Sequence, residues 1–130
     1  MRILIIDDSA VMRKILESAL RHAGLELAHV LHASNGLEGL AELQSAATRD
    51  ESFDLILCDL HMPVMDGLAF LVEKPRRNLA RGVPAVMITG DAADPNLLEA
   101  IAAGAQGYIM KPFTLDQMQT CITSLLPTAV

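Results

Sequence analysis

Four short apolar segments of this chain each run into a charged or hydroxyl-bearing residue. The segments cover residues 3–6, 55–58, 86–88 and 108–110, and the residues that follow them are Asp7 with Asp8, Asp59, Thr89 and Lys111. Apolar runs of this length, separated by helical patterns, are typical of buried parallel strands. An open α/β sheet gathers its functional residues just past the carboxyl ends of its strands. The sequence therefore predicts one crevice that holds three carboxylates, a hydroxyl and an ammonium group.

The length and composition indicate one folded domain. The chain has 130 residues, of which 52% are hydrophobic and 20% are charged, so it has enough apolar residues for a core and is not disordered. We expect residues 1–130 to form a single domain. The net charge of −6 argues against direct binding to nucleic acid phosphates and to an anionic membrane surface.

The amino-terminal segment lacks the features of a signal peptide or a membrane span. Only four apolar residues separate Met1-Arg2 from the first aspartate. We therefore expect no membrane insertion, and we take a cytoplasmic location as the default. Cys58 and Cys121 match no metal-binding or disulfide spacing, and both are interpreted as small core residues.

Strand-like and helix-like patterns alternate along the chain. We expect strands at residues 2–6, 25–31, 54–58, 83–88 and 106–110, and helices at residues 9–23, 35–47, 68–74, 94–104 and 114–126. Residues suited to cap a helix begin four of the helices: Ser9, Asn35, Asp94 and Thr114. Pro75 is expected to end the third helix early, and Pro127 follows the fifth. This alternation predicts βαβ units with right-handed crossovers, and hence an α/β fold.

Apolar stripes predict which face of a helix turns inward. The expected inward residues are Val11, Met12, Ile15, Leu16, Ala19 and Leu20 in the first helix, Leu97, Leu98, Ile101, Ala102 and Ala105 in the fourth, and Leu115, Met118, Ile122, Leu125 and Leu126 in the fifth. The outward positions Ala100 and Ala103 would leave the fourth helix unusually uncharged. This pattern indicates either high helix propensity or a face on which a partner docks, and both interpretations stay open.

Three carboxylates in one crevice would repel each other unless a cation neutralises them. Hard oxygen ligands with room for water favour Mg²⁺ over zinc or a fully caged Ca²⁺. One carboxylate could also act as a nucleophile, because aspartate forms acyl phosphates. Lys111 would offset charge on a transferred phosphoryl group, and Thr89 could hydrogen-bond to one of its oxygens. Taken singly, each residue has a plainer explanation, such as a helix cap for Asp8 or Asp59.

Motifs spread along the chain resemble one known family. They are Asp7-Asp8, Asp59-Leu60-His61-Met62-Pro63 with Asp66-Gly67 behind it, Thr89-Gly90, and Lys111-Pro112-Phe113. In combination they resemble the receiver domain of bacterial two-component response regulators, and the resemblance covers about residues 2–126. The family implies a flavodoxin-like, doubly wound sheet of five parallel strands in the order 2-1-3-4-5.

The resemblance also implies which residues carry out the phosphorylation chemistry. Asp59 would be the phosphoacceptor. Asp8 and Asp59 would bind Mg²⁺ directly, together with the backbone carbonyl of His61, and Asp7 would assist through water. Lys111 would pair with the phosphoryl group, and its bond to the following proline would be cis.

A two-state switch is the further implication of the resemblance. Thr89 would move to bond the phosphoryl group and Tyr108 would rotate inward behind it, which would alter the surface made by the fourth helix, the fifth strand and the fifth helix. Tyr108 also has a plainer interpretation as a core aromatic residue. A histidine kinase or a phosphotransfer protein would donate the phosphoryl group, and a separate protein target would bind the altered surface. Such a domain catalyses only its own phosphorylation and dephosphorylation, so it is not primarily an enzyme.

Other functions on the same fold are less well supported. A Mg²⁺-dependent phosphohydrolase with an aspartate nucleophile commonly carries an acid/base aspartate two residues later, where this chain has His61. A flavin or nucleotide binder needs a phosphate-binding loop after the first strand, where Asp7-Asp8 would repel the ligand. A degenerate receiver that serves only as a scaffold would not need the complete set of five functional residues.

Some details stay open at this point. The side chain of His61 is expected to face solvent, and Asp91 would either discourage the approach of anions or orient a hydrolytic water. His29 and His32 fall on opposite faces of a strand, which argues against a metal pair. Only four residues follow the fifth helix, which fits a stand-alone regulator of the chemotaxis type and equally a receiver taken from a longer protein.

Overall fold

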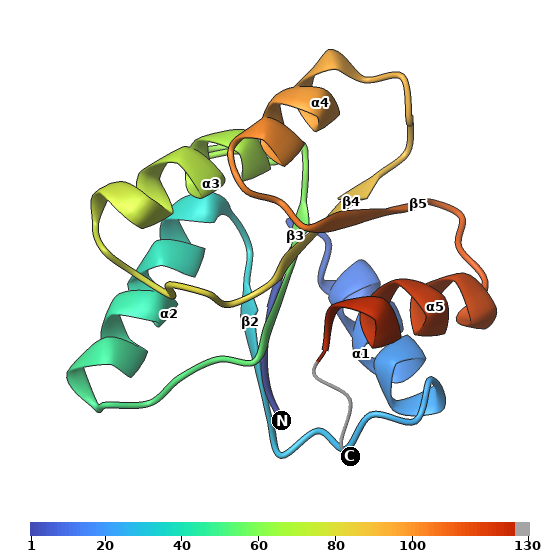
Figure 1. Ribbon diagram of the computed structural model, residues 1–130, viewed down its shortest axis with the longest axis horizontal. Coiled ribbons are helices and arrows are strands. Elements are labelled where there is room, and N and C mark those ends of the chain that lie inside the picture. The colour runs from blue at the N-terminus through green and yellow to red at the C-terminus, as the bar shows by residue number, and fades with distance from the viewer. Residues whose placement is uncertain (127–130) are drawn as a thin grey trace.

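Five parallel strands lie side by side in the order β2-β1-β3-β4-β5 (Figure 1). The computed structural model describes residues 1–126. The strands are β1 (Arg2–Ile6), β2 (His29–Ala33), β3 (Leu55–Asp59), β4 (Ala85–Thr89) and β5 (Gly107–Met110). The chain passes from β1 to β2 at one edge and then returns to β3 on the other side of β1, so the predicted flavodoxin-like sheet is confirmed.

Helices cover both faces of the sheet (Figure 1). On one face lie α1 (Ala10–His22) and α5 (Leu115–Leu125), and on the other α2 (Gly36–Thr48), α3 (Gly67–Arg76) and α4 (Pro95–Ala102). Successive residues of a strand point to opposite faces, and this separates the core into two clusters. In β1, for example, Leu4 and Ile6 belong to one cluster, and Ile3 and Ile5 belong to the other.

Each of the described helices begins at a polar residue whose side chain accepts a hydrogen bond from a free backbone N–H group. These residues are Ser9, Asn35, Asp66, Asp94 and Thr114. Four of them match the sequence prediction, and Asp66 is an addition to it. Thr114 and Gln117 form a reciprocal capping box. Glu38 stands three residues after Asn35, the position of a capping-box partner, but its carboxylate accepts from the N–H and hydroxyl of Ser34 instead.

Four strands begin later than predicted: β2 by four residues, β4 by two, and β3 and β5 by one each. Residues 25–28 were assigned to the second strand, but β1 begins only at Arg2, which pairs with His29, so no neighbouring strand is available to residues 25–28. Their backbone makes other bonds: Leu25 N–H donates to the Leu20 carbonyl and closes the end of α1, and Ala28 N–H donates to the carbonyl of Met1, just before β1. The fourth strand begins at Ala85 rather than Val83, because the N–H of Val83 turns back to Ala80 and Pro84 has no N–H to donate.

Helix α3 continues two residues beyond its predicted end. Pro75 lies in the last turn, where it removes one intrahelical hydrogen bond without preventing the next, from Arg77 N–H to the Glu73 carbonyl. The helix then ends, and Asn78 adopts a left-handed backbone with φ of +59°. Pro127, which was expected to follow the fifth helix, lies outside the described residues.

The predicted inward stripes were partly wrong. In α4, the buried residues are Leu97 and Ala100, so Ala100 points inward and not outward as predicted. Because these two residues share one face of the helix, Leu98 and Ile101 are exposed to solvent. In α1, the buried face is narrower than expected, and Val11 and Ile15 are exposed. In α5, Leu115 is exposed. Five large apolar side chains were assigned to the core but lie at the surface: Val11, Ile15, Leu98, Ile101 and Leu115.

The helices of residues 1–126 include none with both the length and the apolar character needed to cross a bilayer.

Candidate functional site

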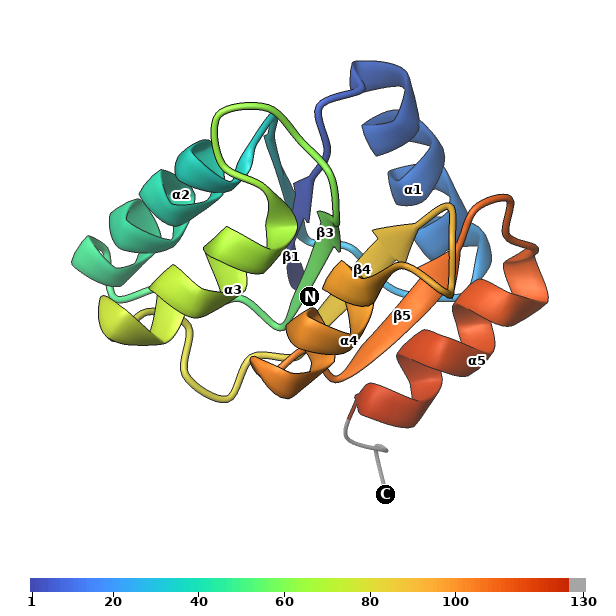
Figure 2. The ribbon, with the colours of Figure 1, turned by 90° about the horizontal axis from the view of Figure 1, so that it is seen from above.

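The three predicted carboxylates lie together at the carboxyl ends of two neighbouring strands. Asp7 and Asp8 directly follow β1, and Asp59 is the last residue of the neighbouring strand β3. Each residue offers a carboxylate oxygen, and these oxygens lie within 4.8 Å of one another. Asp7 is buried and Asp8 is exposed, while Asp59 is 8% exposed, so the cluster opens to solvent at one side. The loops that follow β1 and β3 leave the arrowhead ends of these strands on the same side of the sheet (Figure 2).

Lys111 reaches the same cluster from the loop after β5. Its Nζ lies 3.5 Å from Oδ1 of Asp59 and 3.5 Å from Oδ2 of Asp7. The backbone N–H of Lys111 donates to the Thr89 carbonyl, which fixes the start of this loop against β4. The peptide bond between Lys111 and Pro112 is cis, as the resemblance implied.

The carboxylates of the cluster are incompletely neutralised. Burial raises the pKa of Asp59, the charge of Asp7 raises it further, and the Lys111 ammonium only partly opposes them. Oδ1 of Asp7 accepts a hydrogen bond from Ser9 N–H, but its Oδ2 is buried and has no hydrogen-bond partner in the described part of the chain. A buried anionic oxygen beside two further carboxylates is a donor set that fits Mg²⁺. The cluster is therefore able to hold a metal ion.

Thr89 and Tyr108 lie on the two strands next to the cluster. Thr89 is the last residue of β4 and is buried. Its hydroxyl donates to the Asp91 carbonyl and accepts from the Asp91 N–H, both at 3.2 Å. Tyr108 on β5 is about half exposed, so in this conformation it is not a core aromatic residue. The carboxylate of Asp91 accepts from Ala93 N–H and so shapes the loop after β4.

Gly67 allows the loop after β3 to pack closely against the backbone of Asp59. A Cβ atom at this position would lie 2.4 Å from the main-chain oxygen of Asp59 and 2.7 Å from Cε of Met87. The N–H of Gly67 also donates to the Leu60 carbonyl. Residue 67 therefore has no space for a side chain, and the close approach fixes the backbone that carries Asp59.

Two polar networks beside the cluster were not predicted from the sequence. The side chain of His61 is 58% exposed, as expected, but its ring also bonds to Asp94, the N-cap of α4. The side chain of Arg13 in α1 turns back to the loop after β1 and donates to the main-chain carbonyl of Asp7. Neither contact has a local sequence signal, because each joins residues that are distant in the chain or on different elements. Cys58 is buried as predicted, and Cys121 is only partly buried.

Comparison with known proteins agrees with this geometry. The family model of the response regulator receiver domain matches residues 3–123. The chemotaxis protein CheY1 of Helicobacter pylori (strain J99) is 31% identical over 128 residues, which is 98% of each chain. Chemotaxis protein CheY-3 of Vibrio cholerae is 36% identical over 114 residues, covering 88% of this chain and 82% of that protein. The crystal structure of CheY4 of Vibrio cholerae has a TM-score of 0.80 and 30% identity, covering 96% of this chain and 98% of that one.

The chain belongs to the response regulator receiver domain family. It resembles single-domain chemotaxis proteins of the CheY type over nearly its whole length. A receiver domain is a signalling module phosphorylated on an aspartate and not a conventional enzyme. The acidic cluster of Asp7, Asp8 and Asp59 is consistent with a magnesium site.

Proposed function

We propose that Asp59 accepts a phosphoryl group from a histidine kinase or a phosphotransfer protein, and that residues 1–130 act as one receiver domain. The observation that carries this proposal is the position of Asp59 at the end of β3, between two other carboxylates and the ammonium of Lys111. Asp59 is the member of the cluster that combines a partly open position with direct contact to Lys111. Asp7 contacts the same ammonium but is buried, which disfavours it as an acceptor.

The same residues would hold Mg²⁺. Asp8 and Asp59 would ligate it directly, the backbone carbonyl of His61 would add a third oxygen, and Asp7 would assist through water. When bound, Mg²⁺ would neutralise charge on the carboxylates and on the phosphoryl oxygens. Oδ2 of Asp7 supports this assignment, because it is buried, accepts no hydrogen bond from the described residues, and has the Lys111 ammonium at 3.5 Å as a partial counter-charge that three carboxylates must share.

The transfer itself is a displacement at phosphorus. A carboxylate oxygen of Asp59 forms the new bond to phosphorus, and the bond between phosphorus and the imidazole nitrogen of the donor breaks. The electron pair of that bond stays on the imidazole, which is then protonated from water. Lys111 would balance charge on the transferred group, and Thr89 would hydrogen-bond to it after moving.

The output surface would be formed by α4, β5 and α5. Large apolar side chains are exposed on these elements: Leu98, Ile101, Tyr108, Met110 and Leu115. The side chain of Leu98 is 69% exposed, so it adds little to the core of the described residues. This favours the interpretation of α4 as a docking face over simple helix propensity, although the residues differ from those that the sequence suggested.

In the proposed switch, Thr89 would move to bond the phosphoryl group and Tyr108 would turn inward, changing this surface for an unidentified downstream protein. The Thr89 hydroxyl makes two hydrogen bonds to the backbone of Asp91, and both would have to break for Thr89 to move. We place the protein in the cytoplasm on the basis of the proposed donor. It would bind no nucleic acid directly and insert into no membrane, in keeping with its net charge of −6.

A direct test uses a small phosphodonor such as acetyl phosphate with Mg²⁺, followed by the intact mass of the protein. We expect the wild type to gain one phosphoryl group, the gain to disappear in a chelator, and Asp59→Asn to gain none. Asp50→Asn, an exposed aspartate after α2, is the matched control and should gain as much as the wild type. No gain in the wild type, or an equal gain in Asp59→Asn, would refute the proposal.

A further inference from the structure

Arg13 connects α1 to the loop that carries two of the three acidic residues. It lies one turn into the helix and is half-buried. Its Nη1 donates to the main-chain carbonyl of Asp7 at 2.6 Å, and its Nε donates to Nδ1 of His32 at 3.2 Å. One guanidinium group thus spans the loop after β1 and the edge strand β2.

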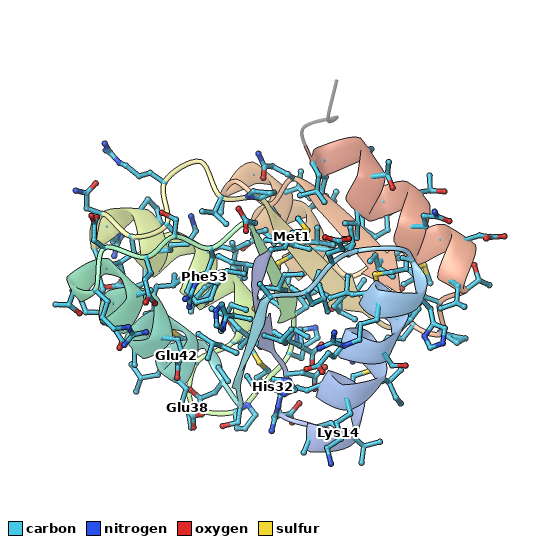
Figure 3. All side chains as sticks on the ribbon, turned by 90° about the horizontal axis from the view of Figure 1, so that it is seen from below. Met1, Lys14, His32, Glu38, Glu42 and Phe53 are labelled. Carbon is cyan, nitrogen blue, oxygen red and sulfur yellow. The ribbon has the colours of Figure 1, made fainter. Side chains whose placement is uncertain are left out.

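His32 is itself held on the other side of its ring. Nε2 of His32 lies 3.0 Å from Oε1 of Glu17, which also contacts Arg21 one turn further along α1. Because Nδ1 accepts from Arg13, the ring carries its proton on Nε2 and donates it to Glu17. Figure 3 shows His32 on β2 against α1, with Lys14 at the outer side of the same helix. Glu17 and His32 therefore fix the position of Arg13.

A hydrogen bond to the carbonyl of Asp7 can fix the backbone of the loop after β1, which carries Asp7 and Asp8. The N–H of Asp7 is bonded to the Ala33 carbonyl, and its Oδ1 accepts from Ser9 N–H. The remaining main-chain group, the carbonyl, belongs to the same rigid peptide plane as the N–H of Asp8. Fixing this carbonyl sets the orientation of the plane, and hence the direction in which the side chain of Asp8 leaves the backbone.

We propose that Arg13 is a positioning residue for the magnesium site, held in place by His32 and Glu17. It acts through the Asp7 carbonyl and does not touch the metal. This inference rests on the proposed function, because it assumes that Asp7 and Asp8 serve the cation. The role requires a guanidinium, since a lysine ammonium has no planar pair of donors with which to bond the carbonyl and the imidazole together.

The test is calorimetric titration of the full chain with MgCl₂, compared between the wild type and Arg13→Ala, Arg13→Lys and His32→Ala. We expect Arg13→Ala to weaken Mg²⁺ binding about tenfold, the scale seen when a partner of a metal-binding residue is removed. Arg13→Lys keeps the charge and should recover only part of the loss, and His32→Ala should lose a smaller part. Lys14→Ala removes one positive charge from the same turn, is exposed, and should bind like the wild type.

A second readout separates positioning from a loss of folding. Thermal unfolding in a chelator should show that each variant is folded at the titration temperature. With saturating Mg²⁺, the rate of phosphorylation by a small phosphodonor should return to within about twofold of the wild type in Arg13→Ala, because only metal affinity is impaired. The conservative Arg13→Lys variant keeps the test available if Arg13→Ala does not fold.

Failure of the inference is distinct from failure of the proposed function. If the wild type binds Mg²⁺ and Arg13→Ala binds it equally well, Arg13 has no positioning role and the proposed function is untouched. If Lys14→Ala is weakened as much as Arg13→Ala, the effect is long-range charge and the inference is also overturned. If the wild type binds no Mg²⁺, both fall together.

Discussion

The imidazole of His61 bonds to the carboxylate of Asp94, and this contact ties the loop after β3 to the first turn of α4. His61 lies two residues after the proposed phosphoacceptor, and Asp94 caps the helix that contributes to the proposed output surface. The contact raises the pKa of His61 and lowers the pKa of Asp94, in each case chiefly through the hydrogen bond between them.

These shifts predict a pH window for the contact in metal-free protein. A raised pKa means that His61 contributes stability below its unfolded pKa and loses it as pH rises through the folded value. A lowered pKa means that Asp94 contributes stability above its unfolded pKa and loses it as pH falls through the folded value. The coupling should therefore be present at about pH 5.5 and absent at about pH 9.

A double-mutant cycle of His61→Ala and Asp94→Asn, measured by urea unfolding at both pH values with a chelator present, checks this directly. The coupling should be small, because the His61 side chain is largely exposed and solvent screens the pair. Equal coupling at both pH values would show that the contact does not depend on the charge of His61.

Asp59 should destabilise the metal-free protein near neutral pH. Its pKa is raised mainly by burial, so its ionised form is less favourable in the folded chain than in the unfolded one, and stability rises as pH falls through the folded pKa. Asp59→Asn should raise the free energy of unfolding at about pH 7 by on the order of 1 kcal/mol in a chelator. The gain should shrink at about pH 4, and the exposed control Asp50→Asn should show none. A less stable Asp59→Asn protein would contradict this account.

Val64 carries backbone strain in the loop after β3. Its φ is +69°, a region that β-branched residues rarely adopt, and its side chain is 77% exposed. Val64→Gly should therefore stabilise the protein by about 1 kcal/mol in urea unfolding. Val72→Gly, at an exposed position of the nearby helix α3, should destabilise it by about the same amount. Destabilisation by both substitutions would show that the left-handed conformation of Val64 is not strained.

Gly67→Ala should displace the backbone that carries Asp59. The added methyl would lie 2.4 Å from the main-chain oxygen of Asp59, so the loop or the strand end must shift. We expect a loss of about 1–3 kcal/mol in the free energy of unfolding and slower phosphorylation of the folded fraction. Gly82→Ala is the informative comparison, because Gly82 has a left-handed backbone but no atom within 4 Å of an added Cβ. It should lose stability without slower phosphorylation, and equal slowing in both would contradict the role given to Gly67.

Much of the fold and the main site could be predicted because its signals are local. Four of the five described strands end at or just before a candidate functional residue, and Ser9, Asp94 and Thr114 cap helices through neighbouring backbone groups. The strand-end rule then places Asp8 and Asp59 together without any knowledge of the side-chain packing.

The rest depends on contacts that no local pattern encodes. Leu98 and Ala100 exchanged their expected faces because a short helix contains too few turns to fix its phase from the sequence. The second strand begins late because β1, its only neighbour, begins at Arg2. Arg13 looks like an ordinary surface charge until β2 brings His32 beside it.

The central claim is that the phosphoryl group is formed on Asp59 in a magnesium-dependent reaction. The most direct measurement is to phosphorylate the wild type with a small phosphodonor, reduce the acyl phosphate with borohydride, and locate the resulting homoserine by peptide mass spectrometry. We predict homoserine at position 59 alone, and none when Mg²⁺ is withheld. Homoserine at Asp7 or Asp8, or at position 59 regardless of Mg²⁺, would contradict the account.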